Sequence, residues 1–300
     1  MKILFATDGL SPSLSAGRLL ERIADPHRVD VTAFSVFETV VRSTPDWPPI
    51  VLENVERRAE WASETAEDAV QTLLRGDFKA ETLTANGDPS EEIVRAVEQG
   101  GFGLTVMGAG RRGWLGNLLL GSVSLHVLHS SPTSVLIVHE TEVRHGPVRI
   151  LLGADGSTGA SLARQTLTDF ADPERCEVRV VAVAHEAPVF VQRMPGVIAP
   201  PSVSKDLEVT RVLAERVERY AEEAVTHLCA DGFRAEGRVK DGHPAGQLLD
   251  EAERWNAELV VLGSRGLGSV GRALLGSVSD RIVRRAPATL VGRNSEDARA

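Results

Sequence analysis

The chain has 300 residues and a net charge of −9, with 42% apolar, 25% charged and only 4% aromatic residues. This length leaves room for two ordinary domains, and the acidic balance argues against broad binding to nucleic acid or to an anionic membrane. Two cysteines exclude a disulfide scaffold and a Cys-cluster zinc module. The apolar runs fall short of the roughly 18 residues that span a bilayer, and the one at the N-terminus is too short for a signal peptide. We therefore expect a cytoplasmic protein.

The first half of the chain predicts strands alternating with helices. Short apolar runs predict strands, and apolar residues at i, i+3, i+4 and i+7 predict helices. The expected strands lie at 3–6, 31–37, 80–85, 104–107 and 134–138. The expected helices begin at Ser11-Pro12, span about 51–75, follow Asp88-Pro89 and cover 122–130, while the Pro-rich stretch 43–49 is expected to be a loop. Alternating strands and helices favour a parallel sheet covered by helices on both faces, that is, a doubly wound α/β fold.

Two helix starts carry specific cap signals. Ser11 is expected to be an N-cap, with Pro12 at the first helical position. Asp88 is followed three residues later by Glu91, which is typical of a capping box. Both helix starts follow strands, so they lie near the edge of the sheet where ligands of such folds bind.

The second half repeats the first. KILFATDGLS at 2–11 recurs as RILLGADGST at 149–158. LTVMGAGRRGWLGNLLLGSVS at 104–124 recurs as LVVLGSRGLGSVGRALLGSVS at 259–279. The chain is therefore an internal duplication.

The offset between the two copies changes along the chain. It is 147 residues at Asp8 and Asp155 but 155 residues at Gly121 and Gly276. The second half thus carries an eight-residue insertion. The insertion lies after the second strand, between Val183 and Phe233, in a segment that contains the longer Pro-rich stretch 186–201.

We expect two domains, at 1–139 and 147–294. The stretch between them, HETEVRHGP, is short, polar and free of helical periodicity. Both Asp8 and Asp155 end the first strand of their domain, where a parallel sheet brings functional residues together.

A glycine-rich loop follows the fourth strand of each domain. In the second domain, Gly263-Ser264-Arg265-Gly266 is followed after nine residues by Gly276-Ser277. Glycine lets the backbone approach a ligand closely, and a helix start with a serine hydroxyl suits a phosphate. The loop therefore predicts a polyphosphate site, although a plain turn with a Ser cap would have the same sequence.

The loop of the first domain departs from this spacing. Gly108 and Gly121-Ser122 match Gly263 and Gly276-Ser277, but Arg111 stands where the second copy has Gly266. Gly110 and Gly113 flank that arginine. Arg111 either contacts phosphate or fills the pocket. We expect the second site to bind more strongly, because a side chain that narrows the loop affects every phosphate contact, whereas an arginine adds only one or two.

The segment GAGRRG at 108–113 also matches the dinucleotide fingerprint G-x-G-x-x-G. That fingerprint belongs after the first strand of a βαβ unit and needs an acidic residue about 20 positions later. Here it follows the fourth strand, no acid stands at that distance, and the second copy lacks the pattern. NAD binding is therefore disfavoured.

The Asp-Gly strand end together with the pattern G-x2-G-x9-G-[ST] at 263–277 resembles the universal stress protein family, in tandem over nearly all of the chain. The resemblance implies two five-stranded parallel α/β domains, Rossmann-like and similar to the adenine-nucleotide alpha-hydrolases. It implies ATP, with or without Mg²⁺, with adenine near Val36 or Val183 and the ribose near Asp8 or Asp155. Ala154 stands where the first domain has Thr7, which removes one hydroxyl from the second site.

The candidate nucleotide-binding residues form two matching sets. In the first domain they are Thr7, Asp8, Val36, Gly108, Gly110, Gly113, Gly121, Ser122, Val123 and Ser124. In the second they are Asp155, Val183, Gly263, Ser264, Arg265, Gly266, Gly276, Ser277, Val278 and Ser279.

The resemblance also implies pairing through the last strand of each domain. The candidates are 135–138 and 289–291, whose apolar runs would otherwise leave open sheet edges. In a tandem chain the two halves would form this pair internally, and a homodimer stays open.

Other motifs point away from catalysis. No nucleophile elbow and no Walker A lysine is present. His126 and His129 have a metal-compatible spacing but no third ligand, Cys176 and Cys229 belong to no motif, and the two Asp-Gly pairs could be simple turns. We expect an ATP-binding stress-response regulator or switch with no catalytic or metal residues. The alternatives are a nucleotide-free interaction module and a slow ATP hydrolase or adenylyl transferase.

Overall fold

The computed structural model describes residues 1–39, 41–44, 47–51, 55–110, 120–140, 144–184, 203–265 and 275–293. The first half consists of β1 (Lys2–Ala6), α1 (Ser11–Ile23), β2 (Asp30–Phe37), β3 (Val41–Thr44), β4 (Trp47–Val51), α2 (Val55–Leu74), β5 (Lys79–Asn86), α3 (Pro89–Gly100), β6 (Leu104–Gly108), α4 (Ser122–Ser130) and β7 (Ser134–Val138). The second half consists of β8 (Val148–Gly153), α5 (Thr158–Phe170), a short 3-10 helix (Pro173–Arg175), β9 (Cys176–Ala184), α6 (Val203–Ala230), β10 (Arg234–Asp241), α7 (Pro244–Trp255), β11 (Leu259–Gly263), α8 (Ser277–Val283) and β12 (Ala288–Gly292).

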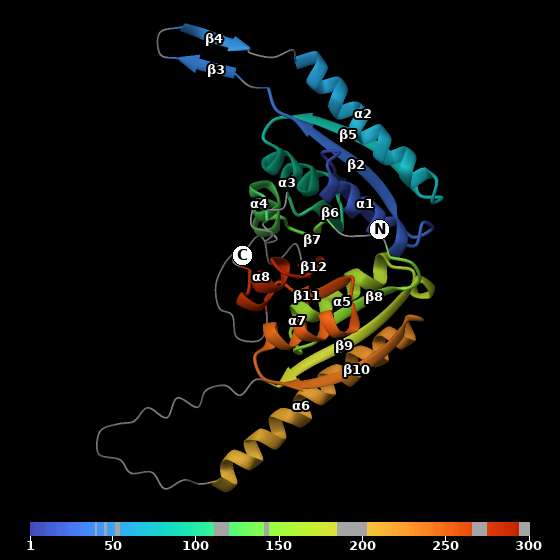
Figure 1. Ribbon diagram of the computed structural model, residues 1–300, viewed down its shortest axis with the longest axis vertical. Coiled ribbons are helices and arrows are strands. Elements are labelled where there is room, and N and C mark those ends of the chain that lie inside the picture. Colours follow the sequence, from blue (N-terminus) through green and yellow to red (C-terminus); the bar gives the residue numbers. More distant parts are fainter. Residues whose placement is uncertain are drawn as a thin grey trace, which may run out of the picture.

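Ten of the strands form one continuous sheet in the order β10-β9-β8-β11-β12-β7-β6-β1-β2-β5. Within each half, all neighbouring strands of this sheet are parallel. The halves meet where β7 and β12 pair antiparallel, with Ala288 opposite Val138 and Leu290 opposite Leu136. Figure 1 shows the two halves on either side of this pair. The predicted fold class, two doubly wound five-stranded units, is confirmed.

Helices cover both faces of the sheet. Helices α1, α2, α5 and α6 pack on one face over a single apolar core that runs through both halves, from Ile3 to Leu290. On the other face, α3 with α4 and α7 with α8 cover two smaller cores. The inner strands are almost wholly buried because they carry apolar runs, whereas the two edge strands β5 and β10 are largely exposed. No helix in the described ranges is long and apolar enough to cross a membrane.

The two predicted helix caps have different outcomes. Asp88 is the N-cap of α3, as predicted, and accepts hydrogen bonds from the backbone N–H groups of Ser90 and Glu91. The Ser90 hydroxyl and these N–H groups hold the pKa of Asp88 below its usual value. The prediction that Ser11 is the N-cap is wrong, because α1 begins at Ser11. Its N-cap is Leu10, whose side chain cannot accept a hydrogen bond.

The Pro-rich stretch predicted as a loop contains a two-stranded hairpin, β3 paired antiparallel with β4. Both strands are edges, and proline is tolerated there because no inner ladder bond is lost. In Figure 1 the hairpin projects beyond the sheet, next to the start of α2. Its counterpart in the second half, 186–201, lies outside the described residues.

Hydrogen bonds outside the strand ladder also join the two halves. The Arg22 guanidinium on α1 donates two hydrogen bonds to the Glu258 carboxylate of the second half, one of them 3.2 Å long. The backbone N–H of His139 donates to the carbonyl of Pro287. The arrangement of the two halves thus rests on strand pairing, a shared core and a largely buried ion pair.

Candidate functional site

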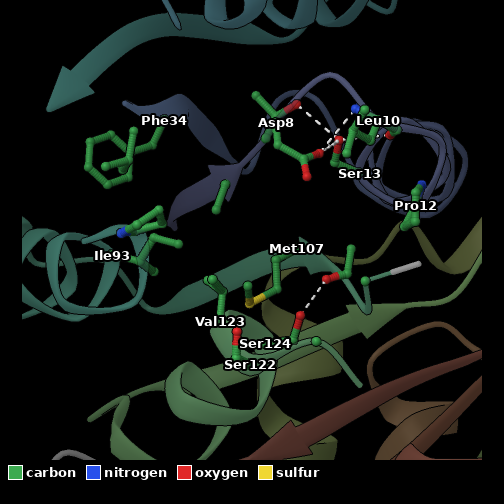
Figure 2. A pocket seen from close by; sticks show the side chains of 17 residues that line it. Asp8, Leu10, Pro12, Ser13, Phe34, Ile93, Met107, Ser122, Val123 and Ser124 are labelled. Carbon is green, nitrogen blue, oxygen red and sulfur yellow. Dashed lines mark hydrogen bonds between the residues drawn. The ribbon is translucent and has the colours of Figure 1, made fainter. Parts of the chain in front are cut away.

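Each half has a cavity at the carboxyl ends of its strands. The first cavity has a volume of about 250 Å³. All candidate residues of the first half that lie in the described ranges line it: Thr7, Asp8, Val36, Gly108, Gly110, Gly121, Ser122, Val123 and Ser124. Figure 2 shows Asp8 and Ser13 on one side of this cavity, opposite Ser122, Val123 and Ser124.

The second cavity is larger, about 510 Å³. It is lined by Asp155, Val183, Gly263, Arg265, Gly276, Ser277, Val278 and Ser279. Ser264 is absent from this lining. It is buried, its backbone N–H donates to the carbonyl of Gly292 and its carbonyl accepts from the N–H of Gly276, so it holds the loop from beneath.

Three candidate positions cannot be placed. Arg111 and Gly113 fall in 111–119 and Gly266 in 266–274, and both stretches lie outside the described residues. Whether Arg111 contacts a ligand or fills space therefore stays a prediction from the sequence.

Gly108 and Gly263 are required by packing. A Cβ on Gly108 would lie 2.6 Å from the backbone nitrogen of Ser13, and one on Gly263 would lie 2.5 Å from the carbonyl carbon of Gly159. Neither glycine has a positive φ. Each lets a strand end touch the first turn of a helix, which narrows the base of the cavity. The close approach that the sequence predicts is therefore to the protein's own helix.

The helix that follows each loop is tied back to the strand end in the same way. In the first half, the N–H of Gly121 donates to the carbonyl of Ala109 over 2.7 Å, and the Ser124 hydroxyl donates to the carbonyl of Gly108 over 2.8 Å. In the second half, Ser279 donates to the carbonyl of Gly263 over 2.8 Å. The second serine of each Gly-Ser-Val-Ser run is thus structural.

The first serine of each run has no such structural bond among the described residues. Ser122 and Ser277 are exposed and line the cavities. Neither hydroxyl makes a hydrogen bond within the described part of the chain. Each can donate to an anionic oxygen entering the cavity.

The strand-end aspartates form hydrogen bonds within their turns, which is one of the two roles that the sequence left open. One carboxylate oxygen of Asp8 accepts from the Ser13 hydroxyl at 2.7 Å and from the N–H of Leu10 at 3.0 Å. One oxygen of Asp155 accepts from the N–H of Ser157 at 2.9 Å. These bonds shape the turn, and the remaining oxygen of each carboxylate can accept from a sugar hydroxyl.

Several residues of the cavity walls were missed by the sequence analysis. The first cavity also contains Phe34, Ile93 and Met107, and the second contains Arg216, Tyr220 and Leu248. For two of these residues, the sequence contains a pattern that could have identified them. Phe34 lies two positions before Val36 and so on the same face of its strand, and Ile93 is one turn inside the helix that starts at Pro89. Arg216 and Tyr220 had none.

Of the other side chains that the sequence analysis singled out, the Cys229 thiol is free and exposed, and it lies outside the lining of both cavities. Within the described ranges, no three His, Cys, Asp or Glu side chains gather to hold a metal ion. Burial raises the pKa of the Cys176 thiol to about 12, which keeps it protonated and unreactive.

Comparison with known proteins gives the family. The model of the universal stress protein family matches residues 1–139 and 148–291. A universal stress protein of Mycolicibacterium smegmatis is 32% identical over 95% of this chain and 94% of its own length. The universal stress protein Rv2623 of Mycobacterium tuberculosis is 35% identical over 72% of this chain and 70% of its own.

Solved structures agree on the fold. A universal stress protein from Archaeoglobus fulgidus superposes with a TM-score of 0.60 at 24% identity, covering 97% of this chain and 98% of that one. A functionally unknown protein from Pseudomonas aeruginosa, PA1789, gives 0.63 at 15% identity over 99% and 94%. With two matched domains and relatives over most of its length, the chain belongs to the universal stress protein family, as a tandem member.

Proposed function

We propose that this stress-response protein binds ATP, or a related adenine nucleotide, in both cavities and works as a nucleotide-dependent regulator. One observation carries the proposal. Twice in the same chain, a strand-end aspartate, a glycine at the end of the fourth strand and a Gly-Ser helix start line a single cavity.

The walls of the second cavity match the parts of a nucleotide. Part of its lining is apolar, including Val183 and Leu248, which suits a flat purine. Asp155 can accept from ribose hydroxyls, while the Ser277 hydroxyl can donate to phosphate. Cavities of a few hundred Å³ are of the usual size for small ligands.

We propose that the second cavity binds more strongly. It has about twice the volume of the first. Arg265 lines it at the position that Gly110 occupies in the first half, and an arginine favours a polyphosphate. Asp8 is the one charged residue among the described residues that line the first cavity.

A binding role is favoured over rapid catalysis. Among the described lining residues, each cavity holds a single carboxylate and no His, Cys or Lys. General acid–base and nucleophilic catalysis need such groups within hydrogen-bond reach of the substrate. A ligand that binds one conformation better than another shifts the population toward it, which is how nucleotide would act as a signal here.

The test begins with the full chain purified from cells. We expect heat denaturation to release an adenine nucleotide identifiable by mass spectrometry, and calorimetry with ATP, with and without Mg²⁺, to approach two sites per chain. Val36→Trp and Val183→Trp each place a large side chain in one cavity and should each remove one site. Val239→Trp, on an exposed position of β10 outside both cavities, is the matched control.

Each alternative function has its own result. Absence of nucleotide in the purified protein and of heat in the titration would favour the nucleotide-free interaction module. Steady ATP turnover above background that is lost in Asp155→Ala would favour an enzyme.

A further inference from the structure

Helix α6 forms a wall of the second cavity that the first cavity lacks. Arg216, Val217 and Tyr220 of α6 line the second cavity. In the first half the corresponding helix is α2, with Trp61 and Thr65 at the positions of Arg216 and Tyr220. No described residue of α2 lines the first cavity. The two sites therefore differ in a whole structural element.

Tyr220 is held against the turn that carries Asp155. A Cβ built on Gly156 would lie 2.3 Å from two carbons of the Tyr220 ring, so the ring rests directly on the Gly156 backbone. Gly156 has a φ of +75°, a conformation that also favours glycine at this position. In the first half, Thr65 lies 3.4 Å from the same point above Gly9. The aromatic ring thus fixes the height of α6 above the second cavity.

Arg216 precedes Tyr220 by four residues, which places both on one face of α6. It lies at the exposed rim of the cavity. Its guanidinium has no hydrogen bond or ion pair with any residue of the described part of the chain. Asp155 is the one acidic residue among the described lining residues of this cavity. An unpaired arginine over a cavity is suited to an incoming anion, which it can hold through two parallel hydrogen bonds.

We propose that Arg216, positioned by Tyr220, contacts the phosphate chain of a nucleotide in the second cavity and makes this site selective for nucleoside triphosphates over monophosphates. Val183 and Leu248 give the cavity an apolar part that suits the base, and the exposed Arg216 is left to the charged end of the ligand. Helix α2 supplies no such contact, so the first site discriminates less. This inference rests on the proposed function and names the ligand class of one of its two sites.

The experiment uses the full chain with Val36→Trp, so that the second site is measured alone. Calorimetry with ATP and with AMP should show a clear preference for ATP that weakens as salt is raised, because the contact is ionic. Arg216→Ala should lower the ATP affinity about tenfold, equal to about 1.4 kcal/mol, and the AMP affinity less than about threefold. Arg219→Ala is the control, since Arg219 lies on the same helix, exposed and outside the cavity lining.

The positioning role of Tyr220 is separated from a role in folding by a conservative variant. Tyr220→Phe keeps the ring on Gly156 and should keep the ATP preference. Tyr220→Ala should lose the ATP preference, as Arg216→Ala does, because Arg216 is then no longer held in position. The reverse test introduces the two α6 side chains at the matching positions of α2, as Trp61→Arg with Thr65→Tyr. In a chain whose second site is blocked by Val183→Trp, these changes should raise the ratio of ATP to AMP affinity at the first site.

The two proposals fail in different ways. Normal ATP binding with the same ratio of ATP to AMP affinity in the Arg216→Ala chain would overturn the role of α6 and leave the proposed function standing. Absence of binding of either nucleotide by the wild-type chain would overturn both.

Discussion

The two cavities occupy the same place in their halves and differ in their walls. In the first, Phe34 stands where the second has Val181, so the first is narrowed by an aromatic ring from its own sheet. In the second, an aromatic ring comes from α6 instead, and it lies at the mouth above Gly156. The two cavities have volumes of about 250 and 510 Å³.

The base of each cavity, by contrast, is the same in both halves. The serine tethers at Ser124 and Ser279 have equal lengths of 2.8 Å, and Gly108 and Gly263 make the same close approach to a helix start. The shared parts are those fixed by backbone contacts. The parts that differ are side chains facing the ligand space, which is where two sites of a duplicated chain can acquire different ligand preferences.

The largest expected effect tests the common base. Gly263→Val would drive a side chain into the backbone of Gly159, where a Cβ alone already lies 2.5 Å from the carbonyl carbon. Because backbone atoms cannot turn aside, we expect the free energy of unfolding to fall by about 3 kcal/mol or more. Gly108→Val should cost about as much, since its Cβ meets the backbone of Ser13 at 2.6 Å. Chemical denaturation measures both.

The control for these substitutions is Gly246→Ala on α7. A Cβ there meets nothing within 4 Å, and alanine in place of a helical glycine should stabilise by about 0.5–1 kcal/mol. A loss below about 1 kcal/mol in both valine variants would contradict the close approach of these glycines to a helix, and a large difference between the two losses would show that the two bases are not equivalent.

The next effect tests a feature of the second half alone. Glu251 on α7 is buried and accepts from Arg179 at 2.9 Å and from Lys240 at 2.7 Å, while Ala96 holds this position in the first half. Burial raises the pKa of Glu251, but the hydrogen bonds and charges of Lys240 and Arg179 outweigh it, and the net pKa lies below the usual value. Glu251→Gln should lower the free energy of unfolding by about 1–2 kcal/mol at neutral pH.

The sign of the pH dependence follows from the lowered pKa. The stabilisation is fully present above the pKa of the unfolded chain, near 4.5, and is lost as the pH falls through the lower folded-state pKa. The difference in the free energy of unfolding between wild type and Glu251→Gln should therefore narrow as the pH falls below about 4.5 and close in stronger acid. Glu98→Gln, an exposed site on α3, should change stability by less than about 0.5 kcal/mol. A gap that persists in acid would contradict the assignment.

Most strands and helices of the fold could be predicted from the sequence, because each depends on a pattern of neighbouring residues. Short apolar runs marked the strands and apolar faces marked the helices, and the helix expected at 122–130 matches α4 at Ser122–Ser130. The internal repeat then located the site, because it placed Asp8, Gly108 and Ser122 at the same edge of a parallel sheet, and these residues do line one cavity.

What the sequence could not supply depends on contacts between distant elements. The spacing of α6 gives no sign that Tyr220 lies on Gly156, 64 residues earlier. The same holds for Gly263, whose need for glycine comes from Gly159 on another element. Ser11 was misassigned as a cap because the local pattern is right, yet the helix starts one residue earlier, beside the Asp8 carboxylate.

The smallest expected effect concerns Ser157, which links the helix start of the second half to its glycine loop. Its hydroxyl accepts from the N–H of Ala160 at 3.1 Å and donates to the carbonyl of Arg265 at 3.3 Å. The first half has Leu10 here, 48% exposed and without a side-chain cap. Ser157→Ala should cost about 1 kcal/mol of stability, as the loss of a helix cap does.

The second consequence of Ser157→Ala separates capping from binding. Freeing the carbonyl of Arg265 loosens one edge of the second cavity, so ATP affinity there should fall about two- to threefold, corresponding to less than about 0.7 kcal/mol. Leu10→Ala should leave stability and the ATP affinity of the second cavity nearly unchanged, because that side chain makes no such link and lines only the first cavity. If Ser157→Ala lowers the melting temperature while ATP binding is untouched, the serine is only a cap. The described differences left to act on the ligand would then be the wall at Arg216 and Tyr220 and the guanidinium of Arg265.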